Sequence, residues 1–252
     1  EQGQVVADRA RRIQAELDAL LSDVTSLNAE VTGEVQVGMI GTTARWLAPL
    51  LFDACRHEHP KVRLVIVDAT TTSLVPQLTS GRFDLAIVNL PLDEPDIEVD
   101  ALFDEDRVLV VPTDHHFAGR SSVAFADLDG EPLLLEPKGT TFRDELDAHA
   151  AAAGATLFAK AEVDGMRLLA TLAFQGFGAA LLPASAAPSW IGGDWQLVPV
   201  TGLPRRSVGV ATRRNHLLSA AARSVRDVLR ATVAAEGPGQ PGVSIIADQP
   251  AT

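Results

Sequence analysis

The sequence predicts an α/β protein made of two lobes, preceded by a long helix that forms dimers. Short apolar segments alternate along the chain with longer amphipathic ones, which is typical of strands and helices in turn. This alternation occurs in two successive blocks of similar layout, and a separate apolar pattern occupies the first 32 residues. Strands that are apolar along their whole length indicate parallel sheets covered by helices on both faces.

Composition and charge narrow the class of protein. The chain has 252 residues, 46% of them hydrophobic, which suffices for one large domain or two small ones. No apolar run approaches the roughly 20 residues of a membrane span, and the polar start EQGQVVADRARR is not typical of a signal peptide. The single cysteine excludes an internal disulfide and favours the cytoplasm. With a net charge of −12, this chain alone is not expected to bind nucleic acid.

The opening segment carries an unbroken heptad pattern without proline or glycine. Its apolar positions recur in alternating steps of four and three residues, at Val6, Ala10, Ile13, Leu17, Leu20, Val24, Leu27 and Val31. A period of 3.5 residues on a polar helix favours pairing with a second helix. The alternative is an amphipathic helix lying on its own domain, which usually shows a wider apolar stripe. We therefore predict a linker and dimerisation helix over residues 1–32, ending at Thr32-Gly33.

The first lobe is expected to contain three strands with two helices between them. The strands are predicted at 34–40, 62–69 and 83–89, and the helices at 43–59 and 73–81. The third strand ends at Asn89, and the following segment LPLDEPD is predicted to cross into the second lobe. A return crossing is predicted near Val198–Thr201. The expected lobes are therefore 33–90 with 200–236, and 91–199.

The second lobe repeats this order of elements. EVDALFDEDRVLVVPT is predicted to form a strand, a turn and a strand, and further strands and helices alternate after it. Strands at 195–200 and 206–214 and a final helix at 218–236 complete the fold. Residues 237–252 are rich in proline and glycine without any period, so we predict a disordered tail.

The ordered set of motifs resembles the LysR-type transcriptional regulators. The matching segments are GEVQVGMIGTTARWLAPLL, FDACRHEHPKVRLVIVDA, LVPQLTSGRFDLAIV, LFDEDRVLVVPTDHHFA, FADLDGEPLLL and LLATLAFQGFGAALLP. The resemblance implies two Rossmann-like lobes of periplasmic-binding-protein type II, a small-molecule effector between them, and a dimer or tetramer. It also implies that promoter DNA is bound through an N-terminal winged helix-turn-helix, which these residues do not include. The alternative is a solute-binding protein of the same two-lobe fold, which has no use for a heptad helix.

Four predicted helix starts follow strand ends and are the candidate effector site. Ligands of open α/β sheets bind at the carboxyl ends of the strands, where free N–H groups attract anions. The candidate residues are Thr42, Thr43, Thr70, Thr71, Thr72, Gly139, Thr140, Thr141, Phe142, Val163, Asp164 and Met166. We expect a small carboxylate with an apolar body, facing Phe142 and Met166. The alternatives are that the threonines only cap their helices and that the two apolar side chains belong to the core.

No pattern for catalysis, a cofactor or a metal stands out. GFGAALLP has two glycines but follows a helix, whereas a dinucleotide motif follows a strand. In CRHEH, Cys55 and His59 share a helix face and His57 does not, so a metal site would need further ligands. TDHHFAGR lacks an accompanying nucleophile and is predicted to be a surface loop. We therefore expect a protein that is not an enzyme.

Overall fold

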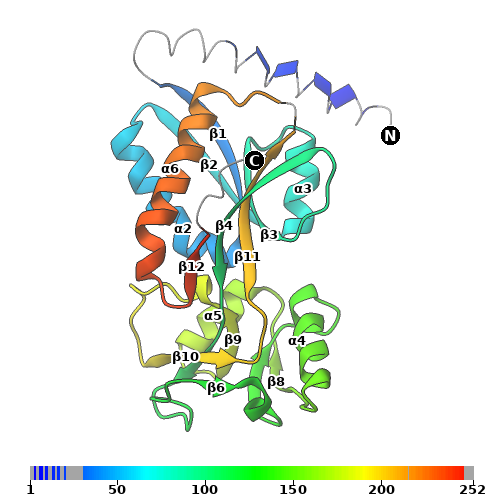
Figure 1. Ribbon diagram of the computed structural model, residues 1–252, viewed down its shortest axis with the longest axis vertical. Coiled ribbons are helices and arrows are strands. Elements are labelled where there is room, and N and C mark those ends of the chain that lie inside the picture. Colours follow the sequence, from blue (N-terminus) through cyan, green and yellow to red (C-terminus); the bar gives the residue numbers. More distant parts are fainter. Residues whose placement is uncertain are drawn as a thin grey trace. The chain divides into compact units, whose positions relative to one another are not determined.

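The computed structural model describes residues 31–214 and 216–246, together with part of the first 20 residues (Figure 1). In that first part it describes residues 3, 6, 7, 9, 10, 13, 14, 16, 17 and 20, and all of them have helical backbone. The chain forms two compact units. Unit 1 comprises Glu1–Phe103, Ser207–Pro238 and Ile245–Thr252, and unit 2 comprises Asp104–Arg206 and Gly239–Ser244.

Unit 1 is built on a six-stranded mixed sheet in the order β12-β4-β11-β3-β1-β2. Its strands are β1 (Gly33–Ile40), β2 (Val62–Ala69), β3 (Leu85–Leu90), β4 (Ile97–Glu105), β11 (Arg206–Arg213) and β12 (Val243–Ile245), and its helices are α2 (Gly41–Glu58), α3 (Thr71–Thr79) and α6 (Ala220–Glu236). Strand β1 pairs in parallel with both β2 and β3, whereas β11 pairs antiparallel with β3. The predicted parallel sheet is therefore confirmed for β1, β2 and β3, and the later strands make it mixed.

The helices of unit 1 cover both faces of its sheet. The chain moves from β1 to β2 in one direction along the sheet and from β2 to β3 in the other. Because such crossovers are right-handed, α2 and α3 must lie on opposite faces. Helix α6 packs beside α2, on the side of the sheet away from α3 (Figure 1). Within the covered core, Trp46 of α2 meets Phe103 of β4 edge to face, with ring centroids 5.4 Å apart.

Unit 2 repeats this wiring around a second six-stranded sheet, in the order β6-β10-β5-β9-β7-β8. Its strands are β5 (Arg107–Pro112), β6 (Val123–Ala124), β7 (Pro132–Leu135), β8 (Phe158–Glu162), β9 (Ala179–Pro183) and β10 (Trp195–Thr201), and its helices are α4 (Thr141–Ala152) and α5 (Met166–Phe174). The strand order β9-β7-β8 matches the order β3-β1-β2 of unit 1. A helix follows each of β7 and β8, just as a helix follows each of β1 and β2. The duplication predicted from the sequence is thus present in the topology.

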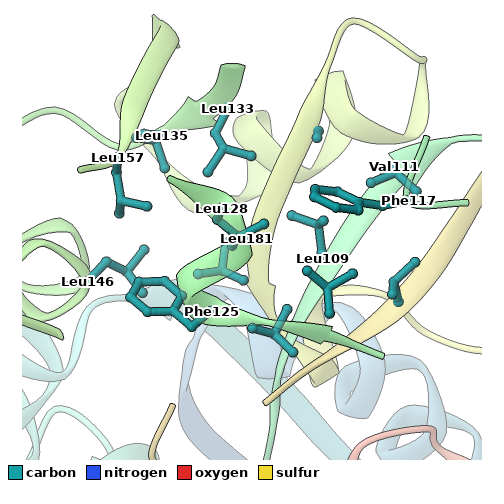
Figure 2. Close-up of a cluster of buried hydrophobic side chains, with 14 of the residues drawn as sticks. Leu109, Val111, Phe117, Phe125, Leu128, Leu133, Leu135, Leu146, Leu157 and Leu181 are labelled. Atoms are coloured by element: carbon teal, nitrogen blue, oxygen red, sulfur yellow. The ribbon is translucent and has the colours of Figure 1, made fainter. Parts of the chain in front are cut away.

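Alternating side chains of the second sheet form two separate cores. Leu133 and Leu135 belong to one cluster, and Leu134 between them belongs to the other, because successive side chains of a strand point to opposite faces. The first cluster is drawn in Figure 2 and includes Leu109, Val111, Phe117, Phe125, Leu128, Leu146, Leu157 and Leu181. With Leu133 and Leu135, these residues come from β5, β7, β9, α4 and the segments between them, so one apolar layer joins most of the unit.

The two chain crossings lie later than the sequence predicted. The segment after Asn89 does not enter unit 2, because β4 returns to the sheet of unit 1. The change of sheet occurs at Asp106, the single residue between β4 and β5. The predicted strand, turn and strand is therefore not a hairpin, which needs at least two loop residues. The return crossing also lies after the predicted Val198–Thr201, because the whole of β10 stays in the second sheet and β11 begins at Arg206.

The C-terminal segment differs from the predicted disorder up to residue 246. Residues Val243–Ile245 form β12 at the edge of the first sheet, next to β4. Gln240 is buried and its side-chain amide donates to the carbonyls of Ala184 and Ala187, at 3.1 and 3.0 Å. Proline and glycine prevented a periodic pattern here, but these long-range hydrogen bonds hold the segment in place. Residues 247–252 lie outside the described part.

The predicted dimerisation helix is described only in part. The heptad positions Val6, Ala10, Ile13, Leu17 and Leu20 have helical backbone and exposed side chains. Val24 and Leu27 lie outside the described residues. Val31 and Thr32 are not helical, so the helix ends before the predicted Thr32-Gly33 boundary. The described part of the chain contains no helix that is long and apolar enough to cross a bilayer.

Candidate functional site

In unit 1, the predicted threonines gather where the parallel strands β1 and β2 end. Helix α2 begins at Gly41 directly after β1, and α3 begins at Thr71 two residues after β2. Because β1 and β2 are parallel and in register from Gly33–Val62 to Ile40–Ala69, both helix starts lie at the same edge of the sheet. Thr42 and Thr43 are buried, Thr71 is half-buried, and Thr70 and Thr72 are exposed.

The helices that start at these strand ends have no side-chain cap. No side-chain capping hydrogen bond is made by Ile40 before α2 or by Thr70 before α3, and the same holds for Thr140 before α4 and Gly165 before α5. Helix α6 provides the contrast, because the Ser219 hydroxyl accepts from the Ala222 N–H at 3.1 Å. Thr70 and Thr140, which stand at the N-cap positions, therefore do not cap their helices with their side chains. The first N–H groups of α2 and α3 keep their capacity to bind an anion.

A buried hydroxyl and a buried amide oxygen at this edge have no hydrogen-bond partner within the described residues. They are the hydroxyl of Thr43 and the side-chain carbonyl oxygen of Asn89, near the end of β3. Such an atom costs about 1–3 kcal/mol when it is left unpaired. The backbone N–H of Asn89 is paired, because it donates to the Thr71 hydroxyl at 3.1 Å. Unpaired buried polar groups next to free helix N–H groups are typical of a binding site rather than of a finished core.

The electrostatics of this edge favour an anion at the helix starts. Neither α2 nor α3 has an acidic residue in its first turn, so the positive end of each helix dipole is not neutralised by its own side chains. Asp68, one residue before the end of β2, is an acidic group at this edge, and one of its carboxylate oxygens is buried. The edge therefore offers donors at the helices and acceptors on two strands, Asp68 on β2 and Asn89 on β3.

In unit 2, the corresponding edge is more acidic. The hydroxyl of Thr140 donates to the Pro137 carbonyl at 3.0 Å, and the Gly139 N–H donates to the first-turn carboxylate of Asp144 at 3.0 Å. Burial, and next the charge of Asp164, raise the pKa of Glu136. Thr141 is exposed. Three carboxylates close to one helix start weaken the attraction of this edge for an anion.

The apolar residues predicted to face the effector, Phe142 and Met166, do not lie on the same face of the sheet of unit 2. Phe142 is half-buried against the cluster around Leu133, whereas Val163 and Met166 pack against the cluster around Leu134. These clusters lie on opposite faces of the sheet, so Phe142 packs on one face and Met166 on the other. Their packing supports the alternative interpretation, in which both side chains belong to the core.

A buried arginine is the polar feature that the sequence analysis missed. Arg107 begins β5 and is 3% exposed; its guanidinium donates to Glu145 at 2.7 Å and lies 5.3 Å from the centre of the Phe142 ring. Burial lowers the pKa of Arg107, and Glu145 opposes that effect. Its Nε and Nη1 atoms have no hydrogen-bond partner among the described residues. The feature of the sequence that could have revealed Arg107 is a charged residue at the start of the apolar run RVLVV.

Two further grooves in unit 1 do not contain the predicted residues. One, of about 320 Å³, lies between α2 and α6 and includes Leu50, Glu58 and Thr232. The other, of about 480 Å³, is lined by residues around His216, including Glu98 and Arg223. Neither lies at the carboxyl ends of β1 and β2, so shape alone does not mark the predicted site.

Two repeated α/β units, with uncapped helices at the carboxyl ends of their parallel strands, define a two-lobed ligand-binding protein. Residues 28–234 match the family described as the LysR substrate binding domain. The chain therefore belongs to the LysR-type transcriptional regulators, and it comprises their effector-binding domain, with a fold of periplasmic-binding-protein type II. The members of this family are regulators rather than enzymes, as the sequence predicted.

Several relatives carry names that refer to hydrogen peroxide or to OxyR. A probable hydrogen peroxide-inducible genes activator of Streptomyces viridosporus is 35% identical over 185 residues, which are 73% of this chain and 59% of that protein. The DNA-binding transcriptional dual regulator OxyR of Escherichia coli K12 is 30% identical over 232 residues, 91% of this chain and 76% of that protein. A reduced form of OxyR from N. meningitidis is similar in structure, with a TM-score of 0.66 and 28% identity, covering 85% of this chain and 100% of that one.

Proposed function

We propose that this chain is the sensing and oligomerising part of a cytoplasmic transcriptional regulator whose effector is a small organic anion. The effector would be a carboxylate with an apolar body, bound at the carboxyl ends of β1 and β2 in unit 1. Promoter DNA would be contacted by parts of the regulator other than these 252 residues, since the net charge of −12 opposes phosphate binding.

The observation that carries this proposal is the pair of uncapped helix starts of α2 and α3 beside the unpaired Thr43 hydroxyl. A carboxylate placed there would accept hydrogen bonds from helix N–H groups and from Thr43 at the same time. Hydrogen bonds that involve a charged group are worth about 1.5–3 kcal/mol each, so a few of them support micromolar affinity. Asn89 can rotate its amide to donate instead of accept, and Asp68 can accept from a hydroxyl group of the same ligand.

The names of the relatives suggest hydrogen peroxide as a second candidate signal, and Cys55 argues against it. This is the single cysteine of the chain, and it is 2% exposed. Burial, and next the charge of Glu58, raise its pKa to about 11, so only about one thiol in ten thousand is ionised at pH 7. No second thiol is present to form a disulfide within the chain. A bound organic anion is therefore the better-supported signal.

The exposed heptad residues support an oligomer. Val6, Ile13, Leu17 and Leu20 expose between 50% and 67% of their surfaces, on a segment with helical backbone. Large apolar side chains repeated along one stripe of a polar helix are typical of a helix pair. We propose that two copies of the chain pair through this stripe, forming a dimer or part of a tetramer.

A thermal-shift screen of small carboxylates tests the proposed site. A ligand at 100 times its dissociation constant should stabilise the folded chain by about 2.7 kcal/mol. Thr43→Val keeps the shape of the side chain and removes its hydroxyl, so affinity should fall about ten-fold. Thr79→Val is the matched control, because its hydroxyl donates to the Val75 carbonyl away from the strand ends, and it should leave affinity unchanged. Thr141→Val measures the contribution of unit 2.

The proposal fails if no carboxylate shifts the melting temperature. It also fails if Thr43→Val binds the responding carboxylate as tightly as the parent chain does. A shift caused by hydrogen peroxide that disappears in Cys55→Ser would instead support the second candidate.

A further inference from the structure

Three potential metal ligands meet in unit 2, on segments other than those that carry the candidate threonines. His115 and His116 lie in the loop after β5, and Glu131 directly precedes β7. The Nε2 atom of His115 is 3.1 Å from one carboxylate oxygen of Glu131, and that of His116 is 3.4 Å from the other. Within the described residues, these three form the group of His, Cys, Asp or Glu side chains whose ligand atoms all lie within 4.8 Å of one another.

The spacing of these atoms matches the edges of a tetrahedral metal site. Zinc binds nitrogen and oxygen ligands at about 2.0–2.2 Å, which puts any two ligand atoms of a tetrahedron about 3.3 Å apart. The two histidine-to-glutamate distances, 3.1 Å to one carboxylate oxygen and 3.4 Å to the other, are close to this length. One ligand atom from each of the three residues lies within 4.8 Å of the other two, so the side chains would have to draw together around an ion.

The surrounding contacts hold the two imidazoles in place. The Phe117 N–H donates to Nδ1 of His115, with 3.3 Å between the nitrogens, and Nε2 of His115 faces Glu131. Because Nδ1 accepts, Nε2 carries the proton of the neutral ring, and a metal at Nε2 would displace that proton to Nδ1 and replace the bond from Phe117. The two rings stack with centroids 4.5 Å apart, and the His116 ring lies 4.0 Å from that of Phe117. Phe117 is buried in the core drawn in Figure 2, so it anchors the loop.

The burial of the three side chains also suits a metal. The side chains of His115 and Glu131 are 16% and 15% exposed, and that of His116 is 56% exposed. Two ligands are thus shielded, while the third leaves a path for an ion to enter. TDHHFAGR is a surface loop, as predicted, in which Phe117 is the buried residue.

A hydrogen-bonded anchor without metal is the simpler use of the same residues. One imidazole would suffice for it, and His115 already makes that bond to Glu131. A second imidazole stacked on the first and directed at the other oxygen of the same carboxylate adds little to an anchor. It does supply the third ligand that a divalent ion needs.

We propose that His115, His116 and Glu131 bind one divalent first-row transition cation of the zinc type. Imidazole nitrogens and a carboxylate are ligands that zinc accepts, and water would fill the remaining tetrahedral position. The ion would tie the loop after β5 to the segment before β7, and so fix one end of the second sheet.

Calorimetric titration of the tag-free 252-residue chain with zinc chloride at pH 7.4 tests the site. We expect one equivalent to bind, with the affinity reduced at least ten-fold in both His116→Ala and Glu131→Gln. His57→Ala is the matched control, since its ring is exposed on α2 and lies next to the backbone of Asp53 instead, and it should bind zinc like the parent chain. Cobalt in place of zinc should give the visible absorption of a four-coordinate site in the parent chain and not in His116→Ala.

Other results would overturn the proposal. They are a failure of the parent chain to bind zinc, an unchanged affinity in His116→Ala, or an equal loss in His57→Ala. If Glu131→Gln does not fold, His116→Ala decides the question alone, because its side chain is more than half exposed and its removal should leave the circular dichroism spectrum unchanged.

Discussion

The backbone N–H of Asn89 donates a hydrogen bond to the hydroxyl of Thr71, with 3.1 Å between the atoms. The bond ties the end of β3 to the first residue of α3. Thr71→Val removes the acceptor and keeps the shape, so the Asn89 N–H loses its partner in a half-buried position. We expect the free energy of unfolding, measured by urea denaturation, to fall by about 1–3 kcal/mol.

Thr72→Val is the control for this prediction. The Thr72 hydroxyl is exposed and lies 3.0 Å from that of Thr70. Its loss should change the free energy of unfolding by less than about 0.5 kcal/mol. Equal effects of Thr71→Val and Thr72→Val would mean that the bond to Asn89 contributes nothing measurable.

Asp84 should make stability depend on pH. Its carboxylate accepts from the Gln36 N–H at 2.8 Å, and its pKa is raised, chiefly because burial penalises the charged form. A raised pKa means that the folded chain binds this proton more tightly than the unfolded chain does. The stability from this group is therefore present below the unfolded pKa and is lost as the pH rises through the folded one.

The variant Asp84→Asn isolates this effect, because an amide has no charge to bury. Its free energy of unfolding should improve relative to that of the parent as the pH rises from mildly acidic to neutral. Chemical denaturation of both proteins at several pH values provides the comparison. A difference that is constant, or that moves in the opposite direction, would contradict the assignment.

Cys55 should be almost unreactive in the folded chain. Because its pKa is about 11 and its side chain is buried in α2, a disulfide reagent at pH 8 should modify it far more slowly than it modifies a small thiol. Urea should restore ordinary reactivity by exposing the thiol. Mass spectrometry after a brief peroxide treatment should find Cys55 unoxidised in the native chain. Rapid oxidation without denaturant would show that the thiol is accessible.

The exposed heptad stripe should govern the oligomeric mass. Leu17→Glu places a charge on the stripe and should shift sedimentation toward a smaller species, and adding Leu20→Glu should complete the shift. Gln14→Glu introduces the same charge at a helical position outside the heptad pattern and should leave the mass distribution unchanged. If all three proteins sediment alike, the stripe is not the contact between copies.

Much of the fold was predictable because local patterns specify it. The predicted strands at 34–40 and 62–69 differ by at most one residue from β1 and β2, since apolar residues bounded by glycine and polar turns are a strong local signal. The chain crossings were not predictable in the same way. Whether β4 joins the first sheet or the second depends on partners more than a hundred residues away, such as β11.

The candidate site shows the same division. Its threonines could be recognised from the sequence because they follow apolar strands and begin helices. Their hydrogen bonds could not, so the sequence left open whether they cap their helices, and only the structure shows Thr70 and Thr140 without a capping bond. Arg107 escaped notice because its burial depends on Glu145 and Phe142, which lie on another element.

The sequence by itself determined the repeated order of strands and helices, the heptad stripe and the family resemblance, because each depends on residues that are neighbours along the chain. The tertiary structure decided which strands share a sheet, which polar atoms stay unpaired at the end of β1, and that His115 and His116 meet Glu131. These features depend on hydrogen bonds and burial between segments far apart in the chain. The free energy of such contacts is set by the packing of the whole unit, and no local pattern records it.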